Sequence, residues 1–284
     1  MKKTTDPGYN TPWRKSATAM YKKPVDGRIY GTFEVEMDPV LDYIEKQKAK
    51  GIRITITQIA VAAVGRALAL AIPDTNAYIA RGNIYRRENV GIFTTVNKGG
   101  KNEMTGIVIR DIEHKSIFDI TREMDERVEK AREKDQDEGA AKKKNILAAL
   151  PWPFRNWLFR FVRWWYITLG KEMKSMNLTY DAFGSAMVTN IGTHDLQFGF
   201  PALTPIANVP LVIAIGKIEE RPVVRNGEIV IRSILPAVAT LDHRIFDGAQ
   251  GGILATTVRK YLLDPQCLEV PAAEILKKAE QEKE

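Results

Sequence analysis

Alternating apolar and polar positions predict a series of strands along the chain. From Gly27 to Met37, every second side chain is apolar or a glycine, which is typical of a half-buried strand. Comparable runs predict further strands at 77–86, 90–97, 104–111, 185–191, 211–217, 222–225, 228–234 and 237–241. Asn226-Gly227 is a two-residue hairpin signal, so the strands on either side of it are expected to pair.

Apolar residues at helical spacing predict helices between these strands. Asp38 is expected to cap the first long helix, with Pro39 in its first turn. Because strands and helices do not alternate strictly, the pattern predicts an α+β fold. The expected helical segments are one or two turns at 13–20, helices at 38–50, 59–70, 115–134 and 248–263, and a solvated helix after Pro271.

The composition narrows the class of protein. At 284 residues and 44% hydrophobic, the chain has enough apolar surface for one large domain or two small ones. The formal net charge of +7 suits phosphate-bearing ligands or an anionic membrane surface and requires neither, and no nucleic-acid-binding motif accompanies it. The single cysteine, Cys267, excludes an internal disulfide and fits a reducing compartment, and no secretory signal is evident. We therefore expect a cytoplasmic protein that does not bind nucleic acid.

The strongest chemical signal is the octapeptide from Leu241 to Gly248. It places His243 between two carboxylates, Asp242 and Asp247, where a predicted strand gives way to a predicted helix. A neutral imidazole at such a turn is a good base near pH 7. Asp247 is expected to orient the ring or to fix the turn, although a surface histidine beside acids is the commoner arrangement. With three histidines and one cysteine in the chain, no metal site is expected.

This octapeptide resembles the His-x-x-x-Asp-Gly signature of the chloramphenicol acetyltransferase-like superfamily. Its Asp-His-Arg opening is most similar to the catalytic core of the dihydrolipoamide acyltransferases of 2-oxoacid dehydrogenase complexes. The resemblance covers residues 12 to 265 with one interruption. It implies a chloramphenicol acetyltransferase-like two-layer sandwich, in which helices flank a mixed sheet.

The resemblance also implies roles for individual residues. His243 would be the general base that takes the proton from a thiol of coenzyme A or dihydrolipoamide, so that the sulfur attacks a thioester carbonyl. Thr189, in the stretch Met187-Val188-Thr189-Asn190-Ile191-Gly192, would bind the oxyanion, although a threonine on a strand is also common without such a role. Asp247 would pair with Arg14 and, together with Gly248, support the His243 turn.

Two asparagines are weaker candidates for substrate binding. Asn190 follows the oxyanion candidate directly, and Asn208 lies in an Asn-Val-Pro sequence that resembles the Asn-Pro-Pro turn of the family.

The family pattern implies an oligomer. His243 of one chain would face Thr189 of the next in a homotrimer, which can assemble further into a cubic core. Coenzyme A or its acyl thioester would be a substrate. No lipoyl or peripheral-subunit-binding domain is expected on this chain, so the acyl donor is expected to be a lipoyl-bearing protein in trans or a soluble acyl thioester. The alternatives are a non-catalytic scaffold and an acyltransferase with a hydroxyl or amine acceptor.

An aromatic and basic segment interrupts the resemblance. We expect an N-terminal arm at 1–26, a catalytic domain at 27–265 with an insertion at about 142–180, and a polar C-terminal tail at 266–284. If residues 145–170 are helical, Arg155, Asn156, Arg160 and Arg163 are expected to lie on one side of the helix. Its arginines and the lack of an uninterrupted apolar run of ~20 residues argue against a spanning helix. The segment is expected either to contact a neighbouring subunit or the acyl pocket, or to lie on an anionic membrane surface.

Overall fold

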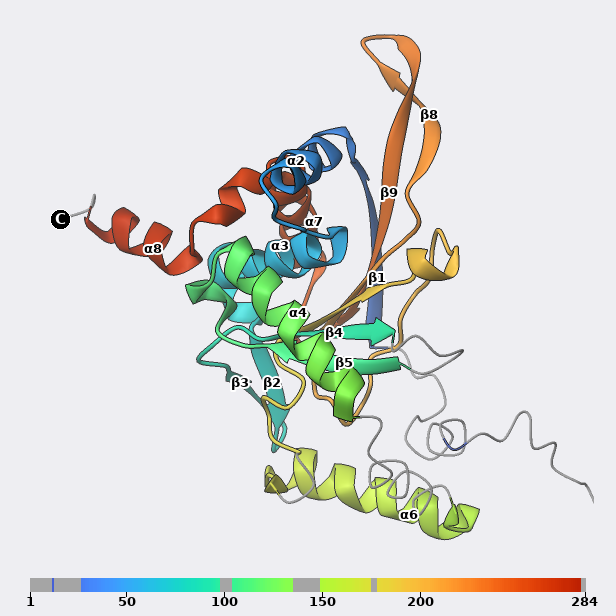
Figure 1. Cartoon of the computed structure of the whole chain (residues 1–284). Coiled ribbons are helices and arrows are strands. Elements are labelled where there is room, and N and C mark those ends of the chain that lie inside the picture. Colours follow the sequence, from blue (N-terminus) through green and yellow to red (C-terminus); the bar gives the residue numbers. More distant parts are fainter. Residues whose placement is uncertain (1–11, 13–26, 98–103, 135–148, 175–177, 282–284) are drawn as a thin grey trace, which may run out of the picture.

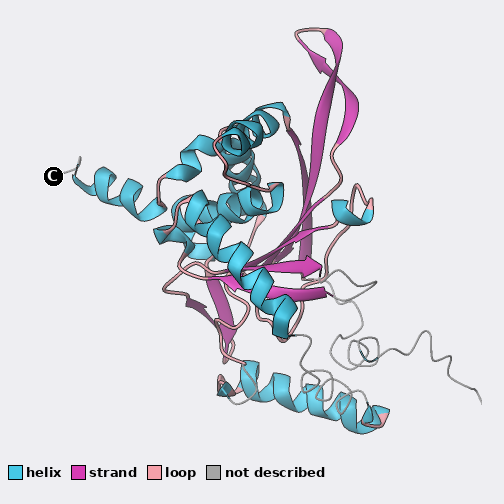
Figure 2. Cartoon of the chain, viewed as in Figure 1, coloured by secondary structure: helices cyan, strands magenta, loops and turns pink. Residues whose placement is uncertain are grey.

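The computed structural model describes residues 12, 27–97, 104–134, 149–174 and 178–281. The predicted helical turns at 13–20, which include Arg14, and the expected loop at 135–144 lie outside the described residues. The described chain forms a seven-stranded mixed sheet, a separate two-stranded hairpin, and a layer of helices over one side of the large sheet (Figure 1, Figure 2). The predicted α+β two-layer fold is confirmed.

The large sheet has the strand order β1-β9-β7-β6-β4-β5, and β8 pairs with the first half of β9. β6 runs parallel to both β4 and β7, and the other neighbours are antiparallel. β9 continues through Pro236, where the sequence predicted a break between two strands. The strands are β1 (Arg28–Glu36), β4 (Ile92–Asn97), β5 (Met104–Ile109), β6 (Ala186–Asn190), β7 (Leu211–Ile215), β8 (Glu219–Arg225) and β9 (Glu228–Asp242).

Two-residue turns close two hairpins, one between β8 and β9 and one within residues 77–86. Asn226 and Gly227 have positive φ angles of 52° and 84°, and they join β8 to β9 as predicted. The prediction of one strand at 77–86 was wrong. Arg81 and Gly82 also adopt positive φ angles, of 51° and 74°, and they fold this run into β2 (Ala77–Ala80) and β3 (Asn83–Arg86).

Four helices cover one side of the large sheet: α2 (Asp38–Ala49), α3 (Ile56–Leu70), α4 (Ile117–Lys134) and α7 (Gly248–Leu263). α3 is buried along most of its length, as its apolar sequence predicts, and Thr55 caps it through a reciprocal pair of bonds with Gln58. The predicted cap of α2 was wrong by one position. Met37 occupies the cap position without a side-chain bond, and Asp38 is the first helical residue.

The C-terminal segment begins inside the fold before it becomes polar. Leu268, in the short 3-10 helix η6 (Pro265–Glu269), is 1% exposed. Glu269 accepts hydrogen bonds from the Tyr43 hydroxyl at 3.0 Å and from the Gln47 amide at 3.1 Å. Burial and the Glu269 carboxylate raise the pKa of Tyr43. The polar tail predicted at 266–284 therefore starts with a packed section, and α8 (Ala272–Gln281) follows as the predicted solvated helix.

The insertion forms helix α6 (Trp152–Arg163), which runs into the π-helical turn η3 (Trp164–Thr168) at the edge of the molecule (Figure 1). Arg155, Val162 and Tyr166 are buried on one side of this helix. The predicted grouping of the arginines was therefore wrong, because Arg155 faces the protein while Arg160 is exposed. Five residues advance a helix by about 500°, which separates the two side chains by roughly 140° around the axis.

Candidate active site

His243 lies in a turn that the sheet holds on both sides. It directly follows β9, and its backbone N–H donates to the carbonyl of Gly27 at 2.9 Å. The N–H of Asp242 donates to the carbonyl of Pro210 at 2.8 Å, and the N–H groups of Ile245 and Phe246 return to the Asp242 carbonyl. The backbone is thus fixed at the end of β9 while the imidazole of His243 is exposed to solvent.

One hydrogen bond determines which ring nitrogen of His243 is available for chemistry. Nδ1 lies 2.8 Å from the backbone carbonyl oxygen of Phe246. A carbonyl oxygen only accepts hydrogen bonds, so Nδ1 carries the proton and donates it. The neutral ring therefore presents the lone pair of Nε2, which is the arrangement a general base needs.

Neither neighbouring carboxylate contacts the ring of His243. Asp242 is 9% exposed and binds Arg244 instead: its Oδ1 accepts from the Arg244 backbone N–H at 3.0 Å and from Nε at 2.9 Å. Its Oδ2 accepts from the guanidinium Nη2 at 2.5 Å. This bidentate pair raises the pKa of Arg244 and closes the turn. Asp242 and Arg244 are both part of the sequence motif, but the ion pair between them was not predicted.

Asp247 fixes the turn by capping α7. Its Oδ1 accepts from the backbone N–H groups of Ala249 at 2.7 Å and Gln250 at 3.1 Å, and the Gln250 side chain accepts in return from the Asp247 N–H at 2.8 Å. The sequence left two roles open to Asp247, orienting the His243 ring or fixing the turn, and the structure shows that it fixes the turn. Its expected partner Arg14 lies outside the described residues. A Cβ at Gly248 would meet no atom within 4 Å, so the chain itself leaves open space beside this residue.

Replacing Asp247 with alanine should destabilise the protein by about 1 kcal/mol, because two backbone donors at the start of α7 lose their acceptor. Denaturant unfolding monitored by circular dichroism measures this loss. Asp247→Asn is the matched control, since asparagine caps helices about as well as aspartate and should keep most of the stability. Equal stability of the alanine and asparagine variants would show that the cap contributes nothing.

Thr189 lies near the C-terminal end of β6, beside a second threonine. Its Oγ1 is 2.7 Å from Oγ1 of Thr95 on β4, and both side chains are half-buried. Because either hydroxyl can donate to the other, Thr95 can supply the proton of this bond and leave the hydrogen of Thr189 free for a ligand. The Asn190 amide donates to Thr57 Oγ1 at 3.0 Å. The sequence did not single out Thr95.

The sheet places His243 and Thr189 at opposite ends of β7. Thr189 pairs with Ala214 near the end of β7, whereas Leu241 pairs with Leu211 at its start, and His243 lies beyond that pair. At ~3.3 Å per residue and ~4.8 Å per strand, the two Cα atoms are about 18 Å apart within one chain. Reacting groups must approach to about 3–3.5 Å. One protomer therefore does not bring the two candidates together.

Asn208 is occupied by the backbone of β2. Its side-chain oxygen accepts from the Ile79 N–H at 3.1 Å, and its amide donates to the Ile79 carbonyl at 2.8 Å. These bonds continue the edge of the hairpin in the way a neighbouring strand would. The φ angle of Asn208 is +53°, in the left-handed region that asparagine adopts more readily than most residues.

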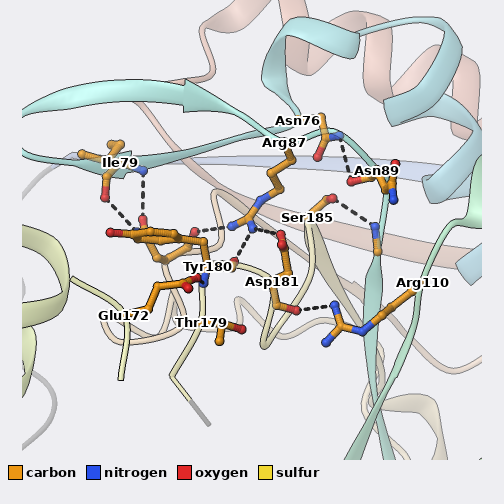
Figure 3. Close-up of polar contacts among 12 residues, drawn as sticks. Asn76, Ile79, Arg87, Asn89, Arg110, Glu172, Thr179, Tyr180, Asp181 and Ser185 are labelled. Atoms are coloured by element: carbon orange, nitrogen blue, oxygen red, sulfur yellow. Dashed lines mark hydrogen bonds and ion pairs between the residues drawn. The ribbon is translucent and has the colours of Figure 1, made fainter. Parts of the chain in front are cut away.

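A buried arginine that the sequence did not predict lies beside the insertion (Figure 3). Arg87 donates to the carboxylate of Asp181 at 2.9 Å, to the carbonyl of Tyr180, and to the carbonyl of Asn208 at 3.1 Å. Its guanidinium carbon lies 5.2 Å from the centre of the Tyr78 ring. A polar pocket of about 490 Å³ adjoins this cluster, with Arg86, Arg110 and Glu172 among its other lining residues. Arg87 ties the end of the insertion to the β2–β3 hairpin.

Within the described residues, no group of three or more His, Cys, Asp or Glu side chains could hold a metal ion. The described helices also include none that is long and apolar enough to cross a membrane.

Three comparisons relate this chain to known proteins. The chain is 23% identical over 245 residues to a dihydrolipoyllysine-residue acetyltransferase component of the pyruvate dehydrogenase complex of Rickettsia felis, a match that covers 83% of this chain and 48% of that protein. A probable dihydrolipoamide acetyltransferase of Listeria monocytogenes superposes with a TM-score of 0.62 at 18% identity, over 92% of this chain and 94% of that one. A cubic core of the pyruvate dehydrogenase complex gives a TM-score of 0.59 at 18% identity, over 85% and 83%.

These likenesses confirm the predicted fold. The chain spans about half or less of the length of the curated relatives it matches. The acyltransferase (catalytic domain) family of the 2-oxoacid dehydrogenases matches residues 16–144 and 169–270, which is most of the chain and leaves out α6 and η3. The chain therefore belongs to the family of 2-oxoacid dehydrogenase acyltransferase catalytic domains.

Proposed function

We propose that this protein transfers an acyl group between coenzyme A and a second thiol, such as dihydrolipoamide, with His243 as the general base. The observation that carries the proposal is the bond from Nδ1 of His243 to the Phe246 carbonyl, which leaves Nε2 ready to accept a proton. Family membership supports the same reaction class. A free thiol with a pKa of ~8.5 is mostly protonated at pH 7, so a positioned base raises the fraction that reacts.

The proposed reaction needs no group beyond the two thiols and the acyl chain. Nε2 of His243 takes the proton as the sulfur forms a bond to the thioester carbonyl carbon. The Thr189 hydroxyl donates to the oxygen that becomes negative, and its bond with Thr95 orients it for this. The intermediate collapses by breaking the other carbon–sulfur bond, and the imidazolium returns its proton to the departing thiolate.

We place the active site between subunits. His243 and Thr189 lie at opposite ends of β7. A shared site therefore forms when the His243 end of one protomer faces the Thr189 end of the next, so that each protomer contributes one of the two residues. Such a head-to-tail contact closes into a ring, and a homotrimer is the ring that the family implies. Assembly of trimers into a larger cubic core, as in the structural relative, is part of this proposal.

The proposal extends to the substrates, the partner and the cellular location. Coenzyme A or its acyl thioester is one substrate, and a lipoyl group carried by another protein is the proposed partner in trans. The positive net charge of +7 suits the phosphates of coenzyme A. The single Cys267, which is a free thiol in the structure, agrees with a reducing, cytoplasmic setting. Asn190 and Gly248 flank the proposed site from the two protomers.

Mixing two inactive variants tests both the chemistry and the shared site. Thr189→Val should lower the acyl-transfer rate by about 10²–10³-fold, because the transition state loses one oxyanion donor. Co-expression of Thr189→Val with His243→Ala in equal amounts should restore about a quarter of the wild-type rate, since one head-to-tail interface in four then contains both intact residues. Mixtures no more active than the separate variants would contradict a shared site.

A further inference from the structure

Helix α6 presents a row of aromatic side chains to solvent. Phe154, Trp157, Phe161 and Trp164 are 66%, 70%, 38% and 47% exposed, and they follow one another at spacings of three and four residues. This spacing places all four on one face of the helix. The row is continuous, because the rings of Trp157 and Phe161 stack with their centres 6.1 Å apart, and the tilted rings of Phe161 and Trp164 have their centres 6.0 Å apart.

The opposite side of the same helix is anchored to the protein. Tyr166 is 1% exposed, donates its hydroxyl to the Thr179 carbonyl at 2.9 Å, and stacks on Tyr180. The carbonyl of Ile167 accepts from the Arg81 N–H on the β2–β3 turn at 2.9 Å. The aromatic row therefore faces away from a fixed support, because the anchoring contacts use the other face.

Positive charge is concentrated around this row. α6 and η3 contain three arginines, Arg155, Arg160 and Arg163, and no acidic residue, which gives this described segment a net charge of +3. Arg160 is exposed, lies within the same turns as Trp157 and Trp164, and has no acidic neighbour within α6 or η3. Four of the five tryptophans of the chain also lie between 152 and 165. This pairing of exposed aromatic rings with arginine is typical of helices that lie in a membrane interface.

The segment is an addition to the family domain. The family match stops at 144 and resumes at 169, so the aromatic row falls wholly within the unmatched part of the chain. The catalytic domain of the family therefore does not explain why these large rings are exposed. An exposed apolar row of this size marks a surface that binds a partner.

We propose that α6 and η3 dock the protein on an anionic phospholipid bilayer. The helix lies in the plane of the interface, the aromatic row enters the boundary between headgroups and acyl chains, and Arg160 contacts lipid phosphate. Docking leaves the protein peripheral.

Charge favours the bilayer over a second copy of the chain as the occupant of this surface. Two copies of α6 and η3 packed against each other would each bring a net charge of +3, and like charges facing each other oppose association. The remainder of the chain has a net charge of +4 and so supplies no excess of negative charge to offset this, whereas anionic lipid supplies negative charge along the whole helix.

Vesicle sedimentation of the full-length protein tests the proposal. We expect the protein to bind vesicles of three parts phosphatidylcholine and one part phosphatidylglycerol, and to bind pure phosphatidylcholine at least tenfold more weakly. The double variant Trp157→Ser, Trp164→Ser should reduce binding to the anionic vesicles at least tenfold, because two interfacial anchors are lost. Leu276→Ser on α8, which changes a 45% exposed residue of another amphipathic helix, is the matched control and should bind like the wild type.

Two outcomes would overturn the proposal. One is equal binding of the wild type and the double variant to anionic vesicles, or no binding by either. The other is a double variant that forms a smaller oligomer in solution by light scattering, which would assign the aromatic row to a second copy of the chain. Acyl transfer without lipid should be unchanged in the double variant, since neither tryptophan belongs to the proposed site, and this readout also shows that the variant is folded.

Discussion

Replacing His243 with alanine should lower the rate of acyl transfer by about 10²–10⁴-fold and leave the fold intact. The loss follows from removing the one group positioned to take the thiol proton. The fold should survive because the imidazole is exposed and makes one hydrogen bond, to the Phe246 carbonyl, whose net contribution to stability is about 1 kcal/mol. Initial rates with an acyl-coenzyme A and dihydrolipoamide measure the first effect, and denaturant unfolding measures the second.

Varying the pKa of the acceptor thiol distinguishes a general base at position 243 from a residue that only shapes the site. A thiol that is already ionised at the assay pH needs no base, so the loss caused by His243→Ala should shrink as the pKa of the acceptor thiol falls. His194→Ala is the matched control, because His194 is also an exposed histidine and should tolerate the change. An equal loss with acidic and ordinary thiols would contradict the role of general base.

Local sequence patterns correctly predicted those elements of the fold that are determined by residues close together in the chain. The hairpin at Asn226-Gly227, the buried helix α3 and the solvated helix α8 were all predicted. The role of Asp247 was also within reach, because Asp at a helix start with Gln three residues later is a capping-box pattern. The same turn chemistry at Arg81-Gly82 was missed, since the apolar run at 77–86 looked like one strand.

The relation between the site residues depends on sheet topology, which the sequence does not show. Motifs predicted His243 and Thr189 separately, but their placement at opposite ends of β7 follows from the strand order. The bond between Thr189 and Thr95 joins residues 94 apart in the chain. The carbonyl that orients His243 belongs to Phe246, and a backbone acceptor leaves no mark on the amino-acid pattern.

Arg87 is the strongest example of such a long-range contact. Two adjacent arginines at 86 and 87 look alike in the sequence, yet the side chain of Arg87 is 1% exposed and that of Arg86 is 65% exposed. Arg87 binds Tyr180 and Asp181, which lie 93 and 94 residues further along the chain (Figure 3). Burial lowers its pKa, and the Asp181 carboxylate opposes that shift.

Arg87→Met should destabilise the protein by about 3–5 kcal/mol, a large part of the total stability of a typical domain. Methionine fills similar space but leaves the carbonyls of Tyr180 and Asn208 without their donor, and unpaired buried polar groups are costly. Asp181 adds less to the loss, because its side chain is 66% exposed and water can replace the guanidinium. The midpoint of denaturant unfolding, compared with the wild type at equal protein concentration, measures the change.

Two neighbouring substitutions show whether burial or charge is responsible. Arg86→Met removes an ion pair with Asp74 whose atoms are 3.7 Å apart and whose side chains are 65% and 92% exposed, so it should cost less than about 1 kcal/mol. Arg87→Lys keeps the charge but cannot span Asp181 and both carbonyls, because an ammonium is a single point rather than a fork, and its cost should fall between the other two. If Arg86→Met and Arg87→Met shift the unfolding midpoint equally, Arg87 does not hold the insertion to the β2–β3 hairpin.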